Sequence, residues 1–211
     1  MVVGLGTGST AAFVVESLAE RVARGLAVLA IPTSEHTTLL ARRLGIPLTS
    51  FAEHRRIDLA IDGADEVERG SLDLIKGRGG ALLREKIVAA ASKRFVVVVD
   101  DQKLVDRLGE HAPVPVEVAQ FGWPATAAAL AKLGAEPELR ADESGPFVTD
   151  GGNFILDCHF GPIASPQETE RAVNLTVGVV ESGLFVGRSS AVVVASQGGV
   201  EIMTCAGRRA G

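Results

Sequence analysis

The chain has 211 residues, of which 46% are hydrophobic and 22% charged, and its formal net charge is −5. Its acidity and low aromatic content exclude the basic surfaces and base-stacking platforms typical of nucleic-acid binders. No stretch is apolar for long enough to span a bilayer, and the first residues lack the pattern of a secretory signal. We therefore expect a globular cytoplasmic protein that binds neither nucleic acid nor membranes.

Apolar runs alternate with helical patterns over the first half of the chain. Buried strands are predicted at residues 1–6, 26–32, 57–65 and 94–103. Amphipathic helices are predicted between them, at residues 9–25, 34–45 and 79–93. Ser9 or Thr10 is expected to cap the first helix and Ser34 the second, and Gly25 is expected to end the first. Such alternation is typical of βαβ units, so we predict an α/β fold with a Rossmann-like parallel sheet and helices on both faces.

The pattern changes near Pro113. The segments that follow have the order β-α-β-β-α-β, which is typical of a small ferredoxin-like α+β domain. They are residues 114–121, 123–134, 135–141, 147–160, 165–177 and 178–187. Within them, TDGGN at 149–153 predicts a hairpin turn. Residues 189–203 predict one more strand, which we expect to return to the first sheet.

The length of the chain allows two small domains, each with its own core. We predict an α/β catalytic domain formed by residues 1–112 and 187–211, with residues 113–186 as an inserted ferredoxin-like α+β domain. Cys158 and Cys205 lie far apart in the sequence and match no metal or redox spacing. We expect both to be buried free thiols, as in a reducing compartment.

Polar clusters follow each of the strands predicted in the first half. They are GTGST at 6–10, TSEHT at 33–37, DGAD at 62–65 and DDQK at 100–103. Because ligands gather at the carboxyl ends of strands in open parallel sheets, these clusters predict a binding site at one edge of the sheet.

The cluster at 6–10 joins a strand to a helix and is suited to an anion. Its glycines allow backbone N–H groups to approach closely, and the helix N-terminus adds partial positive charge. It matches neither a Walker A loop nor a dinucleotide fingerprint, because Ser9 stands where the third glycine should be. We predict a phosphate cradle formed by Thr7, Gly8, Ser9 and Thr10, with a tight turn and helix cap as the alternative.

Two further clusters carry ionisable groups. Asp62 and Asp65 are suited to accept hydrogen bonds from sugar hydroxyls, although turn and cap roles are common for Asp beside glycine. No His accompanies them, so we predict no metal site.

In KGRGGALLREK at 76–86, Lys76 precedes a glycine-rich turn where positive φ is expected. Glu85, about a turn and a half into the following helix, is a candidate general base or a surface residue paired with its basic neighbours. Lys103 is either a ligand contact or an exposed lysine.

Five stretches together resemble a known family. In chain order they are GLGTGSTA, DLAIDGADEV, IKGRGGALLREKIV, VPVEV and TDGGNFILD, and they resemble the A-type ribose-5-phosphate isomerases over about Val2 to Met203. The resemblance implies an aldose–ketose isomerase of the non-oxidative pentose phosphate pathway. It would interconvert D-ribose 5-phosphate and D-ribulose 5-phosphate by proton transfer through an enediolate. It further implies an inserted ferredoxin-like domain, no cofactor, and a homodimer or homotetramer.

The resemblance also implies roles for individual residues. Glu85 would shuttle the proton, Asp62 would assist ring opening, and Lys76 would lie near the reacting oxygens. The substrate-binding residues implied by the matching motifs are Thr7, Gly8, Ser9, Thr10, Asp62, Gly63, Ala64, Asp65, Lys76, Gly77, Arg78, Gly79 and Lys103.

The chain departs from the family pattern at two places, and other functional classes share its architecture. It starts almost on the first strand, where family members usually carry a helix, and Arg78 interrupts a run that is often all glycine. The alternatives are a sugar-phosphate-sensing regulatory domain, an amino-sugar-phosphate deaminase and a CoA transferase. A regulatory domain would not need Glu85, a deaminase would need catalytic His and acid groups, and a transferase would need a Glu nucleophile in a different context.

Overall fold

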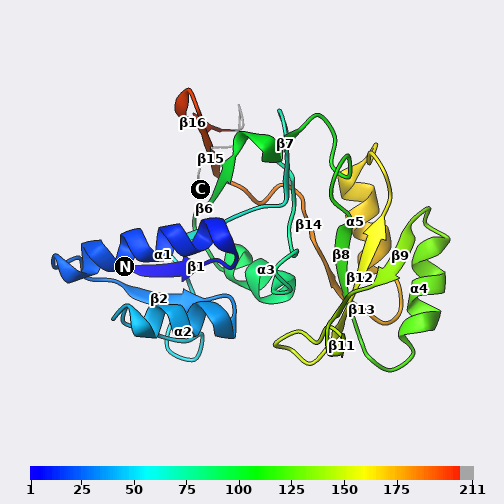
Figure 1. Cartoon of the computed structure of the whole chain (residues 1–211), viewed down its shortest axis with the longest axis horizontal. Helices are drawn as coiled ribbons and strands as arrows, with labels where there is room; N and C mark the ends of the chain where they lie inside the picture. Colours follow the sequence, from blue (N-terminus) through cyan, green and yellow to red (C-terminus); the bar gives the residue numbers. More distant parts are fainter. Residues whose placement is uncertain (205–211) are drawn as a thin grey trace. The chain divides into compact units, whose positions relative to one another are not determined.

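A computed structural model describes residues 1–204 of the chain, which form two compact units (Figure 1). The first unit comprises residues 1–63, 84–101 and 188 onward, and the second comprises residues 64–83 and 102–187. Cys205 and the rest of the segment 205–211 lie outside the described residues. The predicted domain borders, at 112/113 and 186/187, were placed from the order of the predicted strands and helices. The two compact units are a different kind of division, so the predicted borders stay a prediction.

The first unit is built on a six-stranded sheet of order β16-β15-β6-β3-β1-β2. The neighbouring strands are parallel except β16, which is antiparallel to β15. The strands are β1 (Val2–Leu5), β2 (Leu29–Pro32), β3 (Leu59–Asp62), β6 (Phe95–Asp100), β15 (Ala191–Ser196) and β16 (Gly199–Met203). The predicted return of the chain to this sheet is confirmed. The prediction of one strand at 189–203 is wrong, because the segment forms a hairpin of two antiparallel strands, β15 and β16. Gly199, at the start of β16, has a φ angle of +123°.

Three helices accompany this sheet: α1 (Ser9–Ala23), α2 (Glu35–Arg43) and α3 (Leu82–Ala90). Val3 and Leu5 belong to a buried cluster with Val15 of α1. Gly4 faces the other way, because a methyl group there would lie 2.4 Å from a Cγ atom of Val88 in α3. Since successive strand residues point to opposite faces, α1 and α3 cover opposite faces of the sheet.

The ends of these helices agree with the predicted caps in part. Ser34 caps α2, where its side chain accepts a hydrogen bond from the Thr37 N–H at 3.1 Å. The N-cap of α1 is Gly8, not Ser9 or Thr10. Gly8 has φ +108°, a backbone conformation that side-chain-bearing residues rarely adopt. Gly25 has φ +100° directly after the C-cap of α1, as expected for a helix stop.

The larger sheet of the second unit is antiparallel and has the order β13-β8-β12-β9. Its elements are β8 (Val114–Val118), α4 (Trp123–Ala131), β9 (Glu136–Leu139), β12 (Phe154–His159), α5 (Pro166–Asn174) and β13 (Val179–Ser182). Val114, Val116 and Val118 alternate along β8 and share a core cluster with Leu130 of α4 and Val173 of α5. Both helices therefore pack on the same face of the sheet.

Several short elements were not predicted as such. The predicted strand at 178–187 is divided into two strands of different sheets, and the predicted strand at 94–103 ends at Asp100. Four strands form a second small sheet of order β14-β5-β4-β7: β4 (Glu66–Glu68), β5 (Leu74–Ile75), β7 (Leu104–Val105) and β14 (Leu184–Phe185). A short hairpin joins β10 (Ala141–Asp142) to β11 (Gly145–Pro146), and a 3₁₀ turn spans Asp101–Lys103. Strands of two or three residues are too short to show an alternating pattern.

The segment TDGGN forms a turn, but the predicted hairpin is wrong. The Thr149 N–H donates to the Asn153 carbonyl at 2.9 Å, and the Gly152 N–H donates to the Thr149 carbonyl at 2.8 Å. The segment leads into β12, which pairs with β8 and with β9, a strand that ends ten residues before the turn; residues 147–149, directly before the turn, form no strand. The antiparallel contact of that preceding chain is instead the β10–β11 hairpin. No helix within residues 1–204 is both long and apolar enough to cross a membrane.

Cys158 gives this core a pH-dependent stability that can be measured. Burial raises the pKa of the Cys158 thiol from 9.0 to about 12. The unfolded chain therefore loses this proton first, and stability should fall as pH rises from 9 toward 12, by up to about 1.4 kcal/mol per pH unit. The chain has no Tyr, so no phenol titrates in this window.

Urea unfolding at a series of pH values checks this expectation. In a Cys205→Ser background, the free energy of unfolding should fall more steeply with pH than in the same protein carrying Cys158→Ala. Equal slopes in the two proteins would contradict a protonated Cys158 thiol as the cause.

Candidate active site

The carboxyl ends of β1 and β3 are joined by backbone contacts in the first unit. The Gly6 N–H donates to the Ile61 carbonyl at 2.9 Å. Asp62, which ends β3, accepts the Thr7 N–H at 3.1 Å and the Gly63 N–H at 2.7 Å through the same carboxylate oxygen. A methyl group on Gly6 would lie 2.0 Å from that oxygen. Glycine at position 6 is therefore needed for Asp62 to hold the loop.

Hydroxyl groups tie the same loop to the segment after β2. The Thr7 Oγ1 atom lies 2.8 Å from Thr33 Oγ1, 2.8 Å from Ser34 Oγ and 3.2 Å from Thr37 Oγ1. Thr37 in turn donates to the Gly6 carbonyl at 2.9 Å. Thr7 thus has a role in holding the loop, and Thr37 is a support residue that the sequence analysis missed. The only signal in the sequence was its place in the polar cluster 33–37.

The N-terminus of α1 is the part of this edge that suits an anion. Among the described residues, no side chain caps α1, so its first N–H groups are left for a ligand or solvent. Gly8 and Ser9 are exposed, and Thr10 is half-buried. Free amides, the helix dipole and the Ser9 hydroxyl make this loop a site where an anion such as phosphate is stabilised.

Glu85 is buried, with 3% of its surface exposed, and it lies in the first turn of α3 rather than a turn and a half into the helix. The alternative of a surface residue is therefore wrong. Its neighbour Arg84 pairs with Glu35 of α2 at 2.9 Å. A carboxylate near a helix N-terminus is stabilised by the helix dipole, and a buried one is shielded from bulk water. Both properties suit a group that moves a proton.

Lys76 follows β5 in the second unit and is also buried, at 2% exposure. Its backbone N–H donates to the Gly183 carbonyl at 2.9 Å, and its Nζ atom lies 5.6 Å from the centre of the Phe185 ring. Gly77 and Gly80 adopt positive φ angles of +109° and +78°, as the glycine-rich pattern predicted. Backbone contacts and backbone conformation thus set the position of Lys76 and the shape of the turn that follows it.

Asp65 holds the glycine-rich turn from its own side. Its Oδ2 atom accepts the Arg78 N–H at 2.9 Å, while its backbone N–H donates to the Ile75 carbonyl at 2.8 Å. Asp62 and Asp65 thus anchor different loops, one in each unit, which matches the turn-and-cap alternative for both. A carboxylate accepts about four hydrogen bonds, so the bond that the Asp65 side chain accepts from Arg78 leaves it capacity for a ligand.

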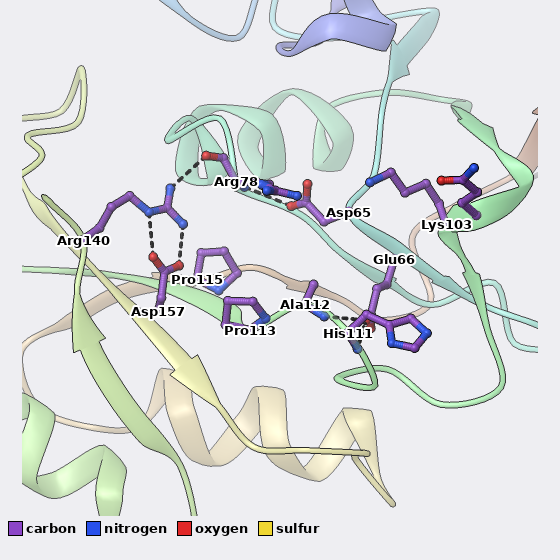
Figure 2. A pocket seen from close by; sticks show the side chains of 11 residues that line it. Asp65, Glu66, Arg78, Lys103, His111, Ala112, Pro113, Pro115, Arg140 and Asp157 are labelled. Carbon is purple, nitrogen blue, oxygen red and sulfur yellow. Dashed lines mark hydrogen bonds and ion pairs between the residues drawn. The ribbon is translucent and has the colours of Figure 1, made fainter. Parts of the chain in front are cut away.

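A cavity of about 420 Å³ lies within the second unit (Figure 2). Its charged lining includes Asp65, Arg78, Lys103, Arg140 and Asp157. Figure 2 shows the Lys103 side chain extending toward the part of the wall where Asp65 lies. Arg140 and Asp157 were missed by the sequence analysis. Arg140 lies outside every motif, and Asp157 ends the stretch TDGGNFILD but was given no role. The two side chains meet through the pairing of β9 with β12.

Glu66 also lines this cavity, and the sequence analysis gave it no role. It is 1% exposed, and its carboxylate accepts the N–H groups of Gly109, His111 and Ala112 at 2.6–2.7 Å. Its position directly after the DGAD motif was the available signal. Among residues 1–204, no group of three His, Cys, Asp or Glu side chains is arranged to hold a metal ion.

The parallel sheet with its accompanying helices defines an α/β protein, and its polar groups gather at the carboxyl edge of the sheet, where such folds commonly bind ligands. Comparison with known proteins gives the family. The family model for ribose 5-phosphate isomerase A (phosphoriboisomerase A) matches residues 29–199. The chain belongs to this family.

Individual relatives agree with this assignment. Ribose-5-phosphate isomerase A of Gloeobacter violaceus is 64% identical over 204 residues, covering 97% of this chain and 89% of that protein. Ribose 5-phosphate isomerase A of Methanocaldococcus jannaschii has 43% identity and a TM-score of 0.93, covering 97% of this chain and 91% of the other. A D-ribose-5-phosphate isomerase in complex with phospho-erythronic acid has 42% identity and a TM-score of 0.94, covering 97% and 90%.

Proposed function

We propose that this protein interconverts D-ribose 5-phosphate and D-ribulose 5-phosphate. The observation that carries this proposal is the match to proteins named ribose-5-phosphate isomerase A over 97% of the chain. The polar groups described above supply the chemistry that such a reaction needs.

The reaction moves a proton between the two carbons next to the sugar oxygens. In the direction of the ketose, a base removes the proton from C2, next to the C1 aldehyde, and an enediolate forms. The same base returns the proton to C1, while the hydroxyl proton of O2 passes to O1. We assign this role to Glu85, because it is a buried carboxylate in the first turn of a helix. One carboxylate suffices for both transfers, so the assignment needs no second base.

The negative charge that develops on the substrate oxygens needs a cation or a hydrogen-bond donor. We assign Lys76 to this role, since its buried ammonium group is a strong donor in an environment of low dielectric. One such donor is typically worth about 3 kcal/mol of transition-state stabilisation. Asp62 and Asp65 are assigned contacts to sugar oxygens, with Asp62 assisting ring opening, and Lys103 is assigned a further substrate contact.

The substrate phosphate is assigned to the loop Thr7–Thr10 at the start of α1. Support comes from its exposed amides and hydroxyl groups and from the related isomerase that binds phospho-erythronic acid, a phosphorylated ligand. Binding energy from the phosphate would hold the sugar in register while the proton moves. The remaining proposed contacts are Gly63, Ala64, Gly77, Arg78 and Gly79.

The proposal also covers the location of the protein, its oligomeric state, its need for a cofactor and the class of its second domain. We propose that the protein works in the cytoplasm as a homodimer or homotetramer and needs no cofactor. We also propose that residues 113–186 are an inserted ferredoxin-like domain. The order β8-α4-β9-β12-α5-β13 and the strand order β13-β8-β12-β9 support this classification.

Conversion of ribose 5-phosphate to ribulose 5-phosphate in metal-free buffer with EDTA tests the proposal. The protein is expected to turn over this substrate and to leave amino-sugar phosphates and acyl-CoA esters unchanged. Binding of sugar phosphates without turnover would instead indicate a regulatory domain. Turnover of an amino-sugar phosphate or an acyl-CoA ester alone would indicate a deaminase or a transferase.

A further inference from the structure

The turn Gly77–Gly80 is contacted by one arginine from the antiparallel sheet of the second unit. The Nη1 atom of Arg140 donates to the Gly77 carbonyl at 2.8 Å and to the Arg78 carbonyl at 3.1 Å. Figure 2 shows the bond to Arg78. The Gly77 carbonyl also accepts the Gly80 N–H at 2.9 Å, which closes the turn. One guanidinium group thus bonds two consecutive carbonyls of the segment that directly follows Lys76.

The position of this guanidinium is set by Asp157 on β12. The Arg140 Nε and Nη2 atoms both donate to the Asp157 carboxylate, with the Nε–Oδ2 distance at 2.9 Å. The two side chains are only 15% and 20% exposed. A bidentate arginine–carboxylate pair has a defined geometry, so the nitrogen that faces the turn has little freedom to move. Lysine has no such fork and would not reproduce the arrangement.

Other contacts confine the turn further. Asp65 accepts the Arg78 N–H at 2.9 Å, so the backbone of Arg78 is bonded on its N–H side and on its carbonyl side. Phe147, whose N–H donates to the Arg140 carbonyl at 2.9 Å, packs against Gly80. A methyl group on Gly80 would lie 2.4 Å from the Phe147 ring. The turn holds two glycines at positive φ, and the surrounding contacts select this one conformation.

We propose that Arg140, oriented by Asp157, is a positioning residue that holds the turn after Lys76 in the conformation the isomerase reaction requires. This inference rests on the function proposed above. Arg140 acts through the main chain: by fixing two carbonyls it fixes the direction of the turn N–H groups and of the Lys76 side chain. The turn carries the proposed substrate contacts Gly77, Arg78 and Gly79, but the proposed phosphate loop Thr7–Thr10 belongs to other elements. Loss of Arg140 should therefore lower turnover by a larger factor than it lowers substrate affinity.

Steady-state kinetics of Arg140→Ala tests the proposal. We expect kcat to fall by about 10- to 100-fold, since small displacements of catalytic groups are known to have effects of this size. KM for ribose 5-phosphate should change by a much smaller factor than kcat, the pattern of a group needed mainly in the transition state. Millimolar guanidinium should restore part of kcat by occupying the vacated site, whereas urea, which has the same shape without the charge, should not.

Arg69→Ala is the matched control. Arg69 also faces a carboxylate, that of Asp106 at 3.8 Å, but both side chains are more than half exposed. This variant should keep the wild-type kcat and show no response to guanidinium. An Arg140→Ala protein that is folded and keeps its kcat would overturn the proposal. A raised KM with unchanged kcat would also overturn it, because Arg140 would then be a binding contact.

Two further arms keep the test decisive. If Arg140→Ala does not fold, Asp157→Asn is the second variant, because it removes the charge that orients Arg140. We expect a smaller fall in kcat in this variant, with little change in KM. A wild-type kcat in Asp157→Asn would overturn the proposal. Hydrogen–deuterium exchange of the peptide spanning residues 76–83 should accelerate in either folded variant and not in Arg69→Ala. This readout needs no activity, so it separates failure of the positioning role from failure of the isomerase assignment.

Discussion

Replacing Glu85 with Gln is expected to lower kcat for ribose 5-phosphate isomerisation by about 10²- to 10⁴-fold, the range typical for a general base. The substitution keeps the size of the side chain and removes its ability to accept a proton. Glu85 is 3% exposed, so solvent is poorly placed to replace it. KM should change little, because the proposed phosphate contacts lie on the α1 loop and do not involve this side chain.

Initial rates, together with calorimetric titration of phospho-erythronic acid, separate the chemical step from binding. Glu20→Gln is the matched control, since this glutamate lies on α1 with 72% of its side chain exposed. The control should behave as wild type in both measurements. Near-wild-type turnover in Glu85→Gln would remove Glu85 as the base. Loss of ligand binding in the same variant would show that its role is structural.

Replacing Glu66 with Ala is expected to lower the free energy of unfolding by about 3–5 kcal/mol, because three N–H groups lose a charged acceptor that is itself buried. The carboxylate accepts hydrogen bonds from Gly109, His111 and Ala112 at 2.6–2.7 Å. Nothing in an alanine side chain can replace these bonds. Glu66→Gln should be less damaging than Glu66→Ala, since an amide oxygen still accepts but its NH₂ group opposes one of the donors.

Urea unfolding of both variants measures this effect. Glu110→Ala is the control from the same loop. Glu110 is exposed, and its carboxylate accepts the Arg107 N–H at 3.0 Å. The Glu110→Ala substitution should lower the free energy of unfolding by no more than about 1 kcal/mol, as is usual for the loss of an exposed hydrogen bond. A Glu66→Ala protein as stable as Glu110→Ala would contradict the anchoring role.

Local patterns determined the elements that are long enough to repeat their periodicity. The strands β1, β2, β3 and β6 and the helices between them follow from apolar runs and amphipathic segments, and Ser34 was identifiable as a cap from its place before α2. The helix start at Gly8 was missed because Ser9 and Thr10 are better caps by side chain. The backbone at the N-cap has a φ angle of +108°, which favours glycine. Helix and cap propensities describe residue types and do not report the φ angle that a particular position needs.

The sequence by itself determined which residue types are available for chemistry: an exposed glycine–hydroxyl loop, clustered Asp residues, a lysine before a glycine-rich turn, and one glutamate in the helix after it. It could not determine what each of them contacts. Asp65 bonds the Arg78 N–H, Glu66 collects three N–H groups from residues 109–112, and Arg140 reaches the Gly77 carbonyl with the help of Asp157. These contacts span from 13 to 63 residues of sequence, and only the folded chain brings the partners within hydrogen-bond distance. A hydrogen bond depends on distance and angle in space, so the supporting side chains of a site leave no periodic or local signal in the sequence.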